Sequence, residues 1–379
     1  MPRVVHVTTV SDSLIFLDGL VQHLGAAGFE VHVVSSPGER LTQFGRAWNV
    51  PTYPLDMPRK VSPLGDLVSA SELTGLFSRL RPDIVHAHTP KGGLLGMLSA
   101  RAAGVPLRLY QMRGLPFVTA KGTLRGILTA TEKVSCAIAT QVICQSPSLR
   151  EVALAEHLAP ADKLTVILKG SNGVDSAGRF NPARFAGQRG ALREAAGIPP
   201  NALVFLFVGR LVRDKGVVEL LEAFTQLAER LPDAWLWCVG PFEPRDPVPS
   251  DVKRALEAHP RIRLEGYAND PSAFYAGADV VVLPTYREGF PNVPLEAAAM
   301  GLPVIATRVP GCVDAVEDNV TGTLVPAQDV RSLSRAMLTY AADPSLRQAH
   351  GRAGRARVER DFARERIWEE VVRHYRKER

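Results

Sequence analysis

Short apolar runs that alternate with helix-length segments constrain the fold of this chain more than any other feature. Residues 3–10 and 30–35 are two such runs, and the segment between them has the apolar spacing of a helix over 17–27. Strand, helix and strand in this order form a βαβ unit, whose strands lie parallel. Further runs follow at 83–87, 107–112, 141–145 and 164–168. The first half therefore predicts a parallel, doubly wound α/β sheet.

The alternation is interrupted once and then starts again. Residues 172–181 are polar and contain glycine, which marks a boundary between an expected domain over 1–171 and a second one over 172–363. The second series of runs lies at 203–208, 234–239, 261–264, 279–283, 303–306 and 323–325. Residues 361–379 predict a charged amphipathic helix, with apolar contacts from Phe362, Trp368, Val372 and Tyr375.

The composition is that of a globular protein. Of the 379 residues, 46% are apolar and 22% are charged. No apolar run reaches the roughly 18 residues of a membrane span, and the first residues lack a signal-peptide pattern, so we expect a cytoplasmic protein. The cysteines form no C-x-x-C pair and are expected to be reduced core thiols; they are Cys136, Cys144, Cys238 and Cys312.

One long segment is basic and free of acids. Residues 84–131 contain no aspartate or glutamate. The basic residues in it are Lys91, Arg101, Arg108, Arg113, Lys121 and Arg125. Together with the nearby apolar residues of 114–118, Leu124, Ile127 and Leu128, they favour transient contact with an anionic membrane surface. A solvated face balanced by acids elsewhere is the alternative. Nucleic acid is not an expected partner, because no binding module is recognisable.

Two carboxylates lie in the stretch 278–307. Residues 280–283 predict a buried strand, Pro284 ends it, and a helix is expected from Asn292, as N-cap, to Gly301. Glu288 and Glu296 can converge only if the loop between them folds back. Ligands of open α/β sheets bind past the carboxyl ends of strands, and the N–H groups of a helix start favour an anion.

Two cations follow the strand at 203–208. Arg210 comes directly after Gly209, and Lys215 precedes a helical pattern. A diphosphate requires this arrangement, because it is strongly negative when bound and gains charge as it leaves. Glu288 and Glu296 would repel a diphosphate, so we expect them to face sugar or ribose hydroxyls. Ordinary surface cations and a helix-start glutamate are the alternatives.

The motifs GRLVRDKG and REGFPNVPLEAAAMGLPVIAT, with Gly311 after them, resemble those of the retaining glycosyltransferases of family 4. The resemblance covers nearly the whole chain. It implies the GT-B fold, in which two Rossmann-like domains face each other across a cleft, and a helix over 364–379 that packs back on the first domain.

The same resemblance implies roles for individual residues. Arg210 and Lys215 hold the donor diphosphate, Glu288 contacts the transferred sugar, and Glu296 takes the ribose. The first three are the expected catalytic residues. Further contacts to the donor come from a loop around the distal phosphate and sugar and from a segment that lines the base: Gly289, Phe290, Pro291, Asn292, Val293, Gly266, Tyr267 and Ala268.

The stretches YQMRGLPFVTAKG and LKGSNGVDSAGRFNP are similar to those of capsular and exopolysaccharide transferases and of bacillosamine-extending enzymes. This likeness implies a UDP-sugar donor, such as a UDP-N-acetylhexosamine, and a lipid-diphosphate-linked saccharide acceptor. It also implies peripheral binding to the inner face of the cell membrane.

The chain departs from the family pattern in two places. Residues 11–14 replace a glycine-rich loop, and Arg113 stands where many members have a histidine. We expect Ser13 in the first loop to serve the acceptor and Arg113 to meet an acceptor phosphate. His88 and Lys91 are further acceptor-side candidates, with a merely satisfied polar side chain as the alternative for His88. His86, deeper in the same strand, is expected to be structural.

No D-x-D motif and no metal-ligand spacing beyond His86 and His88 is present, so neither a tightly bound metal nor a permanently bound cofactor is expected. The resemblance implies retention through attack on the leaving-group side, with a β-phosphate oxygen taking the acceptor proton. The alternatives are transfer to a soluble acceptor, a glycoside hydrolase that uses Glu288 and Glu296, a nucleotide-sugar epimerase, and a non-catalytic nucleotide-sugar-binding protein.

Overall fold

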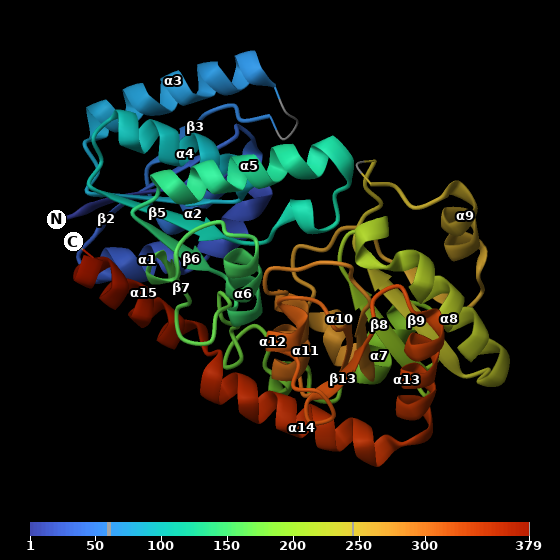
Figure 1. Ribbon diagram of the computed structural model, residues 1–379. Helices are drawn as coiled ribbons and strands as arrows, with labels where there is room; N and C mark the ends of the chain where they lie inside the picture. The colour runs from blue at the N-terminus through green and yellow to red at the C-terminus, as the bar shows by residue number, and fades with distance from the viewer. Residues whose placement is uncertain (59–61, 245, 379) are drawn as a thin grey trace. The chain divides into compact units, whose positions relative to one another are not determined.

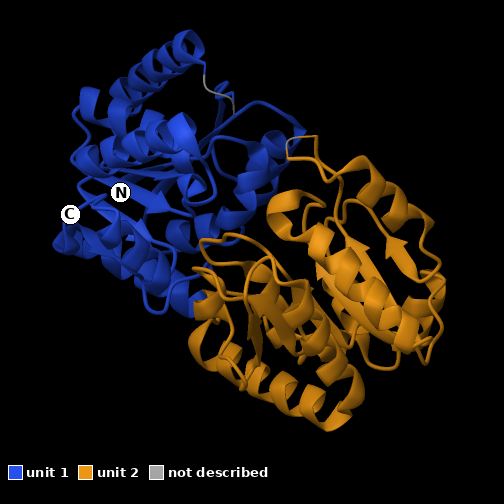
Figure 2. Cartoon of the chain, turned by 45° about the vertical axis from the view of Figure 1, so that its right-hand side comes forward, with its two compact units in different colours: residues 1–172, 365–379 blue, residues 173–364 orange. Residues whose placement is uncertain are grey.

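A computed structural model describes residues 1–58, 62–244 and 246–378. Position 379, at the end of the helix expected over 364–379, lies outside the described residues, as do 59–61 and 245. The chain divides into two compact units. Unit 1 comprises Met1–Asn172 and Glu365–Arg379, and unit 2 comprises Gly173–Arg364 (Figure 2).

Unit 1 contains a seven-stranded sheet in the order β3-β2-β1-β4-β5-β6-β7, with every paired strand parallel. Its strands are β1 (Arg3–Val7), β2 (Glu30–Ser35), β3 (Thr52–Pro54), β4 (Ile84–His88), β5 (Leu107–Met112), β6 (Gln141–Cys144) and β7 (Leu164–Thr165). Its helices are η1 (Ser11–Leu17), α1 (Leu20–Ala26), α2 (Glu39–Trp48), α3 (Pro63–Leu80), α4 (Pro90–Ala102), η2 (Pro116–Val118), α5 (Gly122–Ile138), α6 (Pro147–Ala155), η3 (Ala161–Lys163) and α15 (Arg364–Glu378).

Both faces of this sheet are buried, as the continuous apolar strands require. Val5 and Val85 face a core that α3, α4, α5 and α6 cover. Val4 and Ile84, one residue earlier in each strand, face a second core beneath η1, α1, α2 and α15. The labels of Figure 1 show α15 running beneath β6 and β7, beside α1. A segment from the far end of the sequence thus completes one layer of unit 1.

Unit 2 contains a six-stranded parallel sheet in the order β10-β9-β8-β11-β12-β13. Its strands are β8 (Leu203–Val208), β9 (Ala234–Val239), β10 (Ile262–Leu264), β11 (Val280–Leu283), β12 (Val304–Thr307) and β13 (Gly322–Val325). Its helices are η4 (Pro182–Phe185), α7 (Arg189–Ala195), η5 (Arg213–Lys215), α8 (Val217–Arg230), α9 (Ser250–Ala258), α10 (Ser272–Gly277), α11 (Asn292–Ala299), α12 (Cys312–Ala315), α13 (Val330–Ala342) and α14 (Pro344–Asp361).

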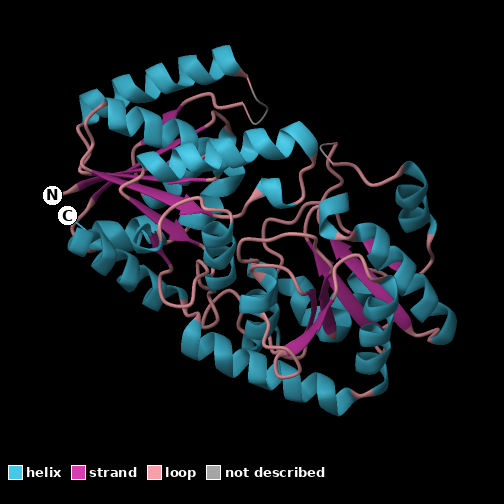
Figure 3. Cartoon of the chain, viewed as in Figure 1, coloured by secondary structure: helices cyan, strands magenta, loops and turns pink. Residues whose placement is uncertain are grey.

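Helices cover both faces of the second sheet as well (Figure 3). Val204 and Val281 face a core with α10, α11 and α14, whereas Phe205 and Val282 face one with α8, α9 and α13. The prediction of two doubly wound parallel sheets is therefore confirmed. The amphipathic pattern over 361–379 starts too early, because α14 extends to Asp361; the helix over 364–379 that the family resemblance implies agrees with α15 in its described residues. Phe362 between them is fully buried and packs on Phe290 in the core of unit 2.

All four cysteines are buried and unbridged, which confirms their prediction as free core thiols. Over the described ranges, every helix is too short or too polar to cross a lipid bilayer.

Candidate functional site

The carboxyl edge of the unit 2 sheet brings two loops together. After β8 the chain passes through Arg210 and η5 to Gly216, which has φ +68° and is the N-cap of α8. A Cβ atom added to Gly216 would lie 2.0 Å from the carbonyl oxygen of Pro284, just past β11. Only glycine permits both this conformation and this approach. The segment that carries Lys215 therefore lies directly against the loop that carries Glu288.

Three contacts fix the second loop on the first. The backbone N–H of Tyr286 donates to the carbonyl of Asp214 (2.8 Å), and the Arg287 guanidinium pairs with the Asp214 carboxylate (2.7 Å). The hydroxyl of Tyr286 donates to Glu219 on α8 (2.6 Å). These contacts constrain the residues on both sides of Lys215 and those just before Glu288. The side chains of Lys215 and Glu288 are therefore held next to each other.

Lys215 and Glu288 form an ion pair, in which 20% of the lysine side chain and 14% of the glutamate side chain are exposed. Arg210 pairs with Glu243, which follows β9, and 49% of its side chain is exposed. Both cations that the sequence assigns to a diphosphate thus already face a carboxylate. The anchored loop turns the Glu288 carboxylate toward Lys215, and its expected contact with sugar hydroxyls stays a prediction.

Glu296 lies on α11 in a different environment. It accepts a hydrogen bond from the hydroxyl of Tyr275 on α10 (2.7 Å). Burial raises the pKa of the Glu296 carboxyl, and the bond from Tyr275 partly opposes this rise. Glu288 is thus held by a cation and Glu296 by a neutral hydroxyl, so the two do not act as an equivalent pair.

Among the described residues, no side chain caps the start of α11. Asn292, predicted as the N-cap, is instead the first residue of the helix, and Pro291 takes the cap position. The Oδ1 atom of Asn292 is buried and has no hydrogen-bond partner within residues 1–58, 62–244 and 246–378. The first N–H groups of a helix need partners from outside it, so this end of α11 has the capacity to bind an anion.

The other donor-side residues lie along the same edge of the sheet. Gly311 has φ +78°, and an added Cβ would lie 2.5 Å from the carbonyl oxygen of Gly289. Its lack of a side chain therefore lets the backbone of residues 289–293 pass close by. Phe290 and Pro291 in that segment are buried, and Val293 is half-buried. Gly266, Tyr267 and Ala268 follow β10, with Gly266 bridged to Gly240 and Tyr267 exposed.

At the carboxyl edge of the unit 1 sheet, Arg113 is surrounded by neutral groups. It donates to His88 Nδ1 (3.1 Å from Nη2), to Gln145 Oε1 (3.3 Å) and to Asn172 Oδ1 (2.7 Å). Its guanidinium lies 4.1 Å from the centre of the Phe16 ring. Burial lowers the pKa of Arg113 to about 9. All five residues line one pocket of unit 1.

The structure does not bring the other two acceptor-side candidates into this pocket. Lys91 donates to the carbonyl of Pro58 (2.5 Å) and pairs with Asp66 on α3 (2.7 Å). Ser13 lies in η1, and neither residue is part of the pocket wall. Of the predicted acceptor-side residues, His88 and Arg113 are therefore the two that the structure places together.

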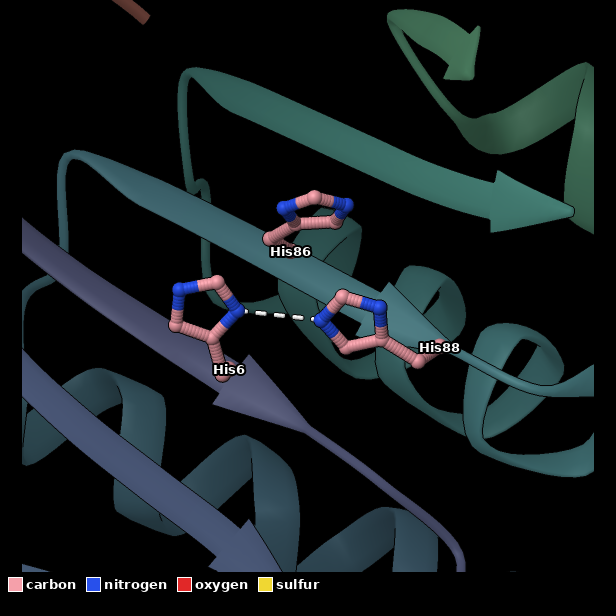
Figure 4. Close-up of side chains that lie close together, drawn as sticks. All are labelled: His6, His86 and His88. Atoms are coloured by element: carbon pink, nitrogen blue, oxygen red, sulfur yellow. Dashed lines mark hydrogen bonds between the residues drawn. The ribbon is translucent and has the colours of Figure 1, made fainter. Parts of the chain in front are cut away.

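The sequence-based interpretation missed His6. The ring of His6 lies beside His86 and His88, and ligand nitrogens of the three residues lie within 4.8 Å of one another (Figure 4). Burial lowers the pKa of all three, that of His6 to about 3, so the rings are neutral. His86 contacts the hydroxyl of Tyr375 on α15 (2.6 Å). The pairing of β1 with β4 places His6 opposite His86, so the position of His6 follows once these two strands are known to be neighbours.

The basic segment contains one exposed apolar patch on and before α5. Val118, Leu124 and Ile127 are exposed by 44%, 53% and 48%. Leu115 and Phe117, which the sequence-based hypothesis included in a membrane-contacting surface, are instead buried in the core of unit 1. Arg125, in this patch, is paired with Glu156 (2.7 Å).

Comparisons with known proteins cover both units. Residues 16–170 match the model of the glycosyl transferase 4-like domain, and residues 202–343 match that of the glycosyl transferases group 1. The capsular polysaccharide biosynthesis glycosyltransferase CapM of Staphylococcus aureus is 34% identical over 375 residues, which are 98% of this chain and 96% of CapM.

Two further likenesses concern a relative and a solved structure. The UDP-Gal:α-D-GlcNAc-diphosphoundecaprenol α-1,3-galactosyltransferase of Escherichia coli is 30% identical over 326 residues, which are 84% of this chain and 81% of that enzyme. The Anabaena protein HepE, solved in complex with UDP-glucose, superposes with a TM-score of 0.82 at 19% identity. It covers all of both chains, so its fold is the same.

Proposed function

Because the chain belongs to the glycosyltransferases with group 1 and 4-like domains, we propose that it transfers a sugar from a nucleotide-diphosphate donor to a saccharide hydroxyl, with retention at the anomeric carbon. The acceptor is a saccharide linked to a polyprenyl diphosphate, and the product enters a cell-surface glycan. The donor is a UDP-sugar, either a UDP-hexose or a UDP-N-acetylhexosamine.

The donor assignment is supported by two loops at one edge of the unit 2 sheet: Lys215 and Arg210 follow β8, and the start of α11 follows the neighbouring strand β11. Two cations and a helix start without a side-chain cap together suit a diphosphate, which presents several anionic oxygens. On binding, the diphosphate replaces Glu288 as the partner of Lys215 and Glu243 as the partner of Arg210. Glu288 then becomes available to the hydroxyls of the transferred sugar, and Glu296 accepts from the ribose.

In the proposed reaction, the bond from the anomeric carbon to the β-phosphate oxygen breaks, and the acceptor oxygen forms the new bond on the same side. The acceptor proton passes to a β-phosphate oxygen. Lys215, Arg210 and the start of α11 stabilise the charge that develops on the leaving diphosphate. No protein nucleophile is proposed, because Glu288 is assigned to the hydroxyls of the transferred sugar and Glu296, which accepts from Tyr275, to the ribose.

The acceptor and the membrane belong to the same proposal. The name of the E. coli relative specifies a diphosphoundecaprenol-linked sugar as its acceptor, and CapM acts in capsular polysaccharide biosynthesis. The exposed residues Val118, Leu124 and Ile127, with Lys121 nearby, suit transient binding to an anionic bilayer that carries such a lipid. We therefore place the protein peripherally on the inner face of the cell membrane. No permanently bound cofactor or tightly bound metal is part of the proposal.

A transfer assay tests the proposal directly. A panel of UDP-sugars is incubated with a GlcNAc-diphosphate lipid, and the anomeric configuration of the product is read by NMR. Transfer with retention supports the proposal. Hydrolysis of simple glycosides without need for a UDP-sugar, or interconversion of the UDP-sugar in the absence of acceptor, overturns it in favour of a hydrolase or an epimerase. Transfer to a free sugar alone replaces the lipid-linked acceptor with a soluble one.

A further inference from the structure

We propose that Arg113 binds a phosphate group in the unit 1 pocket, at the carboxyl edge of the sheet. The phosphate belongs either to the acceptor lipid or to the nucleotide donor. The choice between these two sources rests on the proposed transfer reaction, whereas the anion site itself rests on the geometry of unit 1.

The first observation is that, in the part of the chain that the structure describes, no hydrogen-bond partner of Arg113 carries a negative charge. A guanidinium has five N–H groups and always donates. Among the described residues, Arg113 donates to an imidazole, a glutamine carbonyl and an asparagine carbonyl. Four hydrogen bonds to these groups leave at least one N–H group on Nη2 for another acceptor. Phe16 covers one face of the guanidinium, so an anion must approach at its edge.

The three histidines supply no negative charge, because their rings are neutral. Arg113 also fixes the direction of the hydrogen bonds between His88 and His6. Arg113 donates to His88 Nδ1, so the proton of neutral His88 lies on Nε2 and is donated to His6 Nδ1 (3.0 Å, Figure 4). His6 then carries its proton on Nε2, an atom that is buried without a partner. Each hydrogen bond in the series from Arg113 through His88 to His6 is therefore donated in the direction away from Arg113, and the last group is the N–H donor of His6.

The same direction argues against a metal ion among the three histidines. A metal ligand needs a free nitrogen lone pair, whereas His88 Nε2 holds the proton that His6 accepts. His86 uses one nitrogen with Tyr375 and the other with Gln111. The cationic Arg113 beside His88 would also repel a metal ion. The cluster thus acts as a neutral support for Arg113.

The amide network on the other side adds a second donor. Gln111 Nε2 donates to Gln145 Oε1 (2.8 Å), and Gln145 Nε2 donates to Asn172 Oδ1 (3.2 Å). Asn172 Oδ1 accepts from Arg113 as well, so the NH₂ group of Asn172 remains for another acceptor. Asn172 and Arg113 line the same pocket. A cation and a neutral donor without a neighbouring carboxylate are what a phosphate oxygen requires.

The decisive variant is Asn172→Asp. It keeps the size of the side chain and places a carboxylate where Asn172 Oδ1 already accepts from Arg113, so it supplies the missing counter-ion inside the protein. We expect this variant to fold with an unchanged or raised melting temperature and to lose anion affinity about tenfold or more. Arg113→Met should lose a similar amount. Arg101→Met, an exposed arginine in the same unit, is the matched control.

Binding is measured by calorimetry on the full chain with two probes, UDP and farnesyl diphosphate. Weaker binding of farnesyl diphosphate alone in Asn172→Asp assigns the site to the acceptor phosphate, and weaker binding of UDP alone assigns it to the donor. Unchanged affinity for both probes in a folded Asn172→Asp variant overturns the anion site. Arg113-dependent binding in a chain that transfers no sugar overturns the proposed function and leaves the anion site standing.

Discussion

The ammonium group of Lys215 is ion-paired with the carboxylate of Glu288, and the two lie on segments that Gly216, Asp214 and Arg287 hold together. Lys215, the residue predicted to bind the diphosphate, and Glu288, the residue predicted to bind the sugar, therefore neutralise each other's charge. The Glu288 carboxylate therefore competes with the diphosphate of the donor for the ammonium group of Lys215. Because of this competition, variants of Glu288 and Lys215 should change the affinity for UDP differently from the rate of sugar transfer.

Replacement of Glu288 by glutamine should tighten UDP binding on the order of tenfold, because it removes a charged competitor for Lys215. Turnover with the UDP-sugar should fall, since the sugar loses its carboxylate partner. Lys215→Ala should weaken UDP binding and reduce kcat about a hundredfold. Calorimetry with UDP and an initial-rate assay measure the two effects. Weaker UDP binding by Glu288→Gln would contradict the competition.

The ion pair of Arg210 with Glu243 should also compete with the diphosphate, but with a smaller effect on UDP affinity. Because about half of the Arg210 side chain is exposed, their pair contributes little in water, and Glu243→Gln should raise UDP affinity by at most about fivefold. The gain should shrink at high salt, where the pair is already screened. Asp251→Asn, at an exposed position on α9, is the control and should leave the affinity unchanged.

Tyr275 should set the pH at which the donor binds. Glu296 must be ionised to accept two ribose hydroxyls, and burial raises its pKa while the Tyr275 hydroxyl lowers it. Tyr275→Phe should therefore raise the pKa of Glu296 further and move the acidic limb of UDP affinity to higher pH. Glu296→Gln should abolish that limb. Tyr340→Phe, another buried tyrosine of unit 2, should leave the profile in place.

Glu132 should make the stability of unit 1 depend on pH. This buried carboxyl on α5 accepts from Tyr110 (2.7 Å), and burial raises its pKa from 4.5 to about 7. Between these values the unfolded chain has released the proton and the folded chain keeps it, so stability falls as pH rises. The total loss is about 3 kcal/mol.

In urea unfolding, Glu132→Gln should therefore gain stability relative to the wild type at pH 8 and gain almost none at pH 4. The exposed Glu229→Gln serves as its control. Equal differences between variant and wild type at the two pH values would show that Glu132 ionises normally.

The exposed residues at the start of α5 should mediate binding to lipid. Leu124→Asp combined with Ile127→Asp should reduce flotation with vesicles that contain phosphatidylglycerol, because the change removes apolar surface and adds negative charge. Val320→Asp, at a similarly exposed apolar residue of unit 2, should float as the wild type does. Equal flotation of all three proteins would remove α5 from the proposed membrane surface.

Most strands could be predicted because a buried parallel strand is a continuous apolar run. β2, β5, β8 and β9 begin and end at the expected residues. β3 gave no such signal, since its three residues lie at the sheet edge and are partly exposed. Phe362 was wrongly assigned to the amphipathic face of the last helix, because the sequence does not show that this side chain is buried in unit 2.

The residues of the candidate sites were easier to name than their contacts. Motif spacing placed Lys215 and Glu288 at one edge of a sheet, but their pairing depends on the anchored loop, which spacing does not reveal. The position of His6 beside His86 depends on β1 and β4 being neighbours. Strand order is set by the packing of the whole sheet, so an alternating pattern of strands and helices does not determine it.

The bond between Tyr375 and His86 joins residues that a ribosome makes at very different times. All of unit 2 is synthesised between the main body of unit 1 and α15. While unit 2 emerges, the layer of unit 1 that contains Tyr375 and Val371 is still missing, and the apolar surface facing it is exposed to solvent. The unit that leaves the ribosome first is thus the one whose folding is completed last.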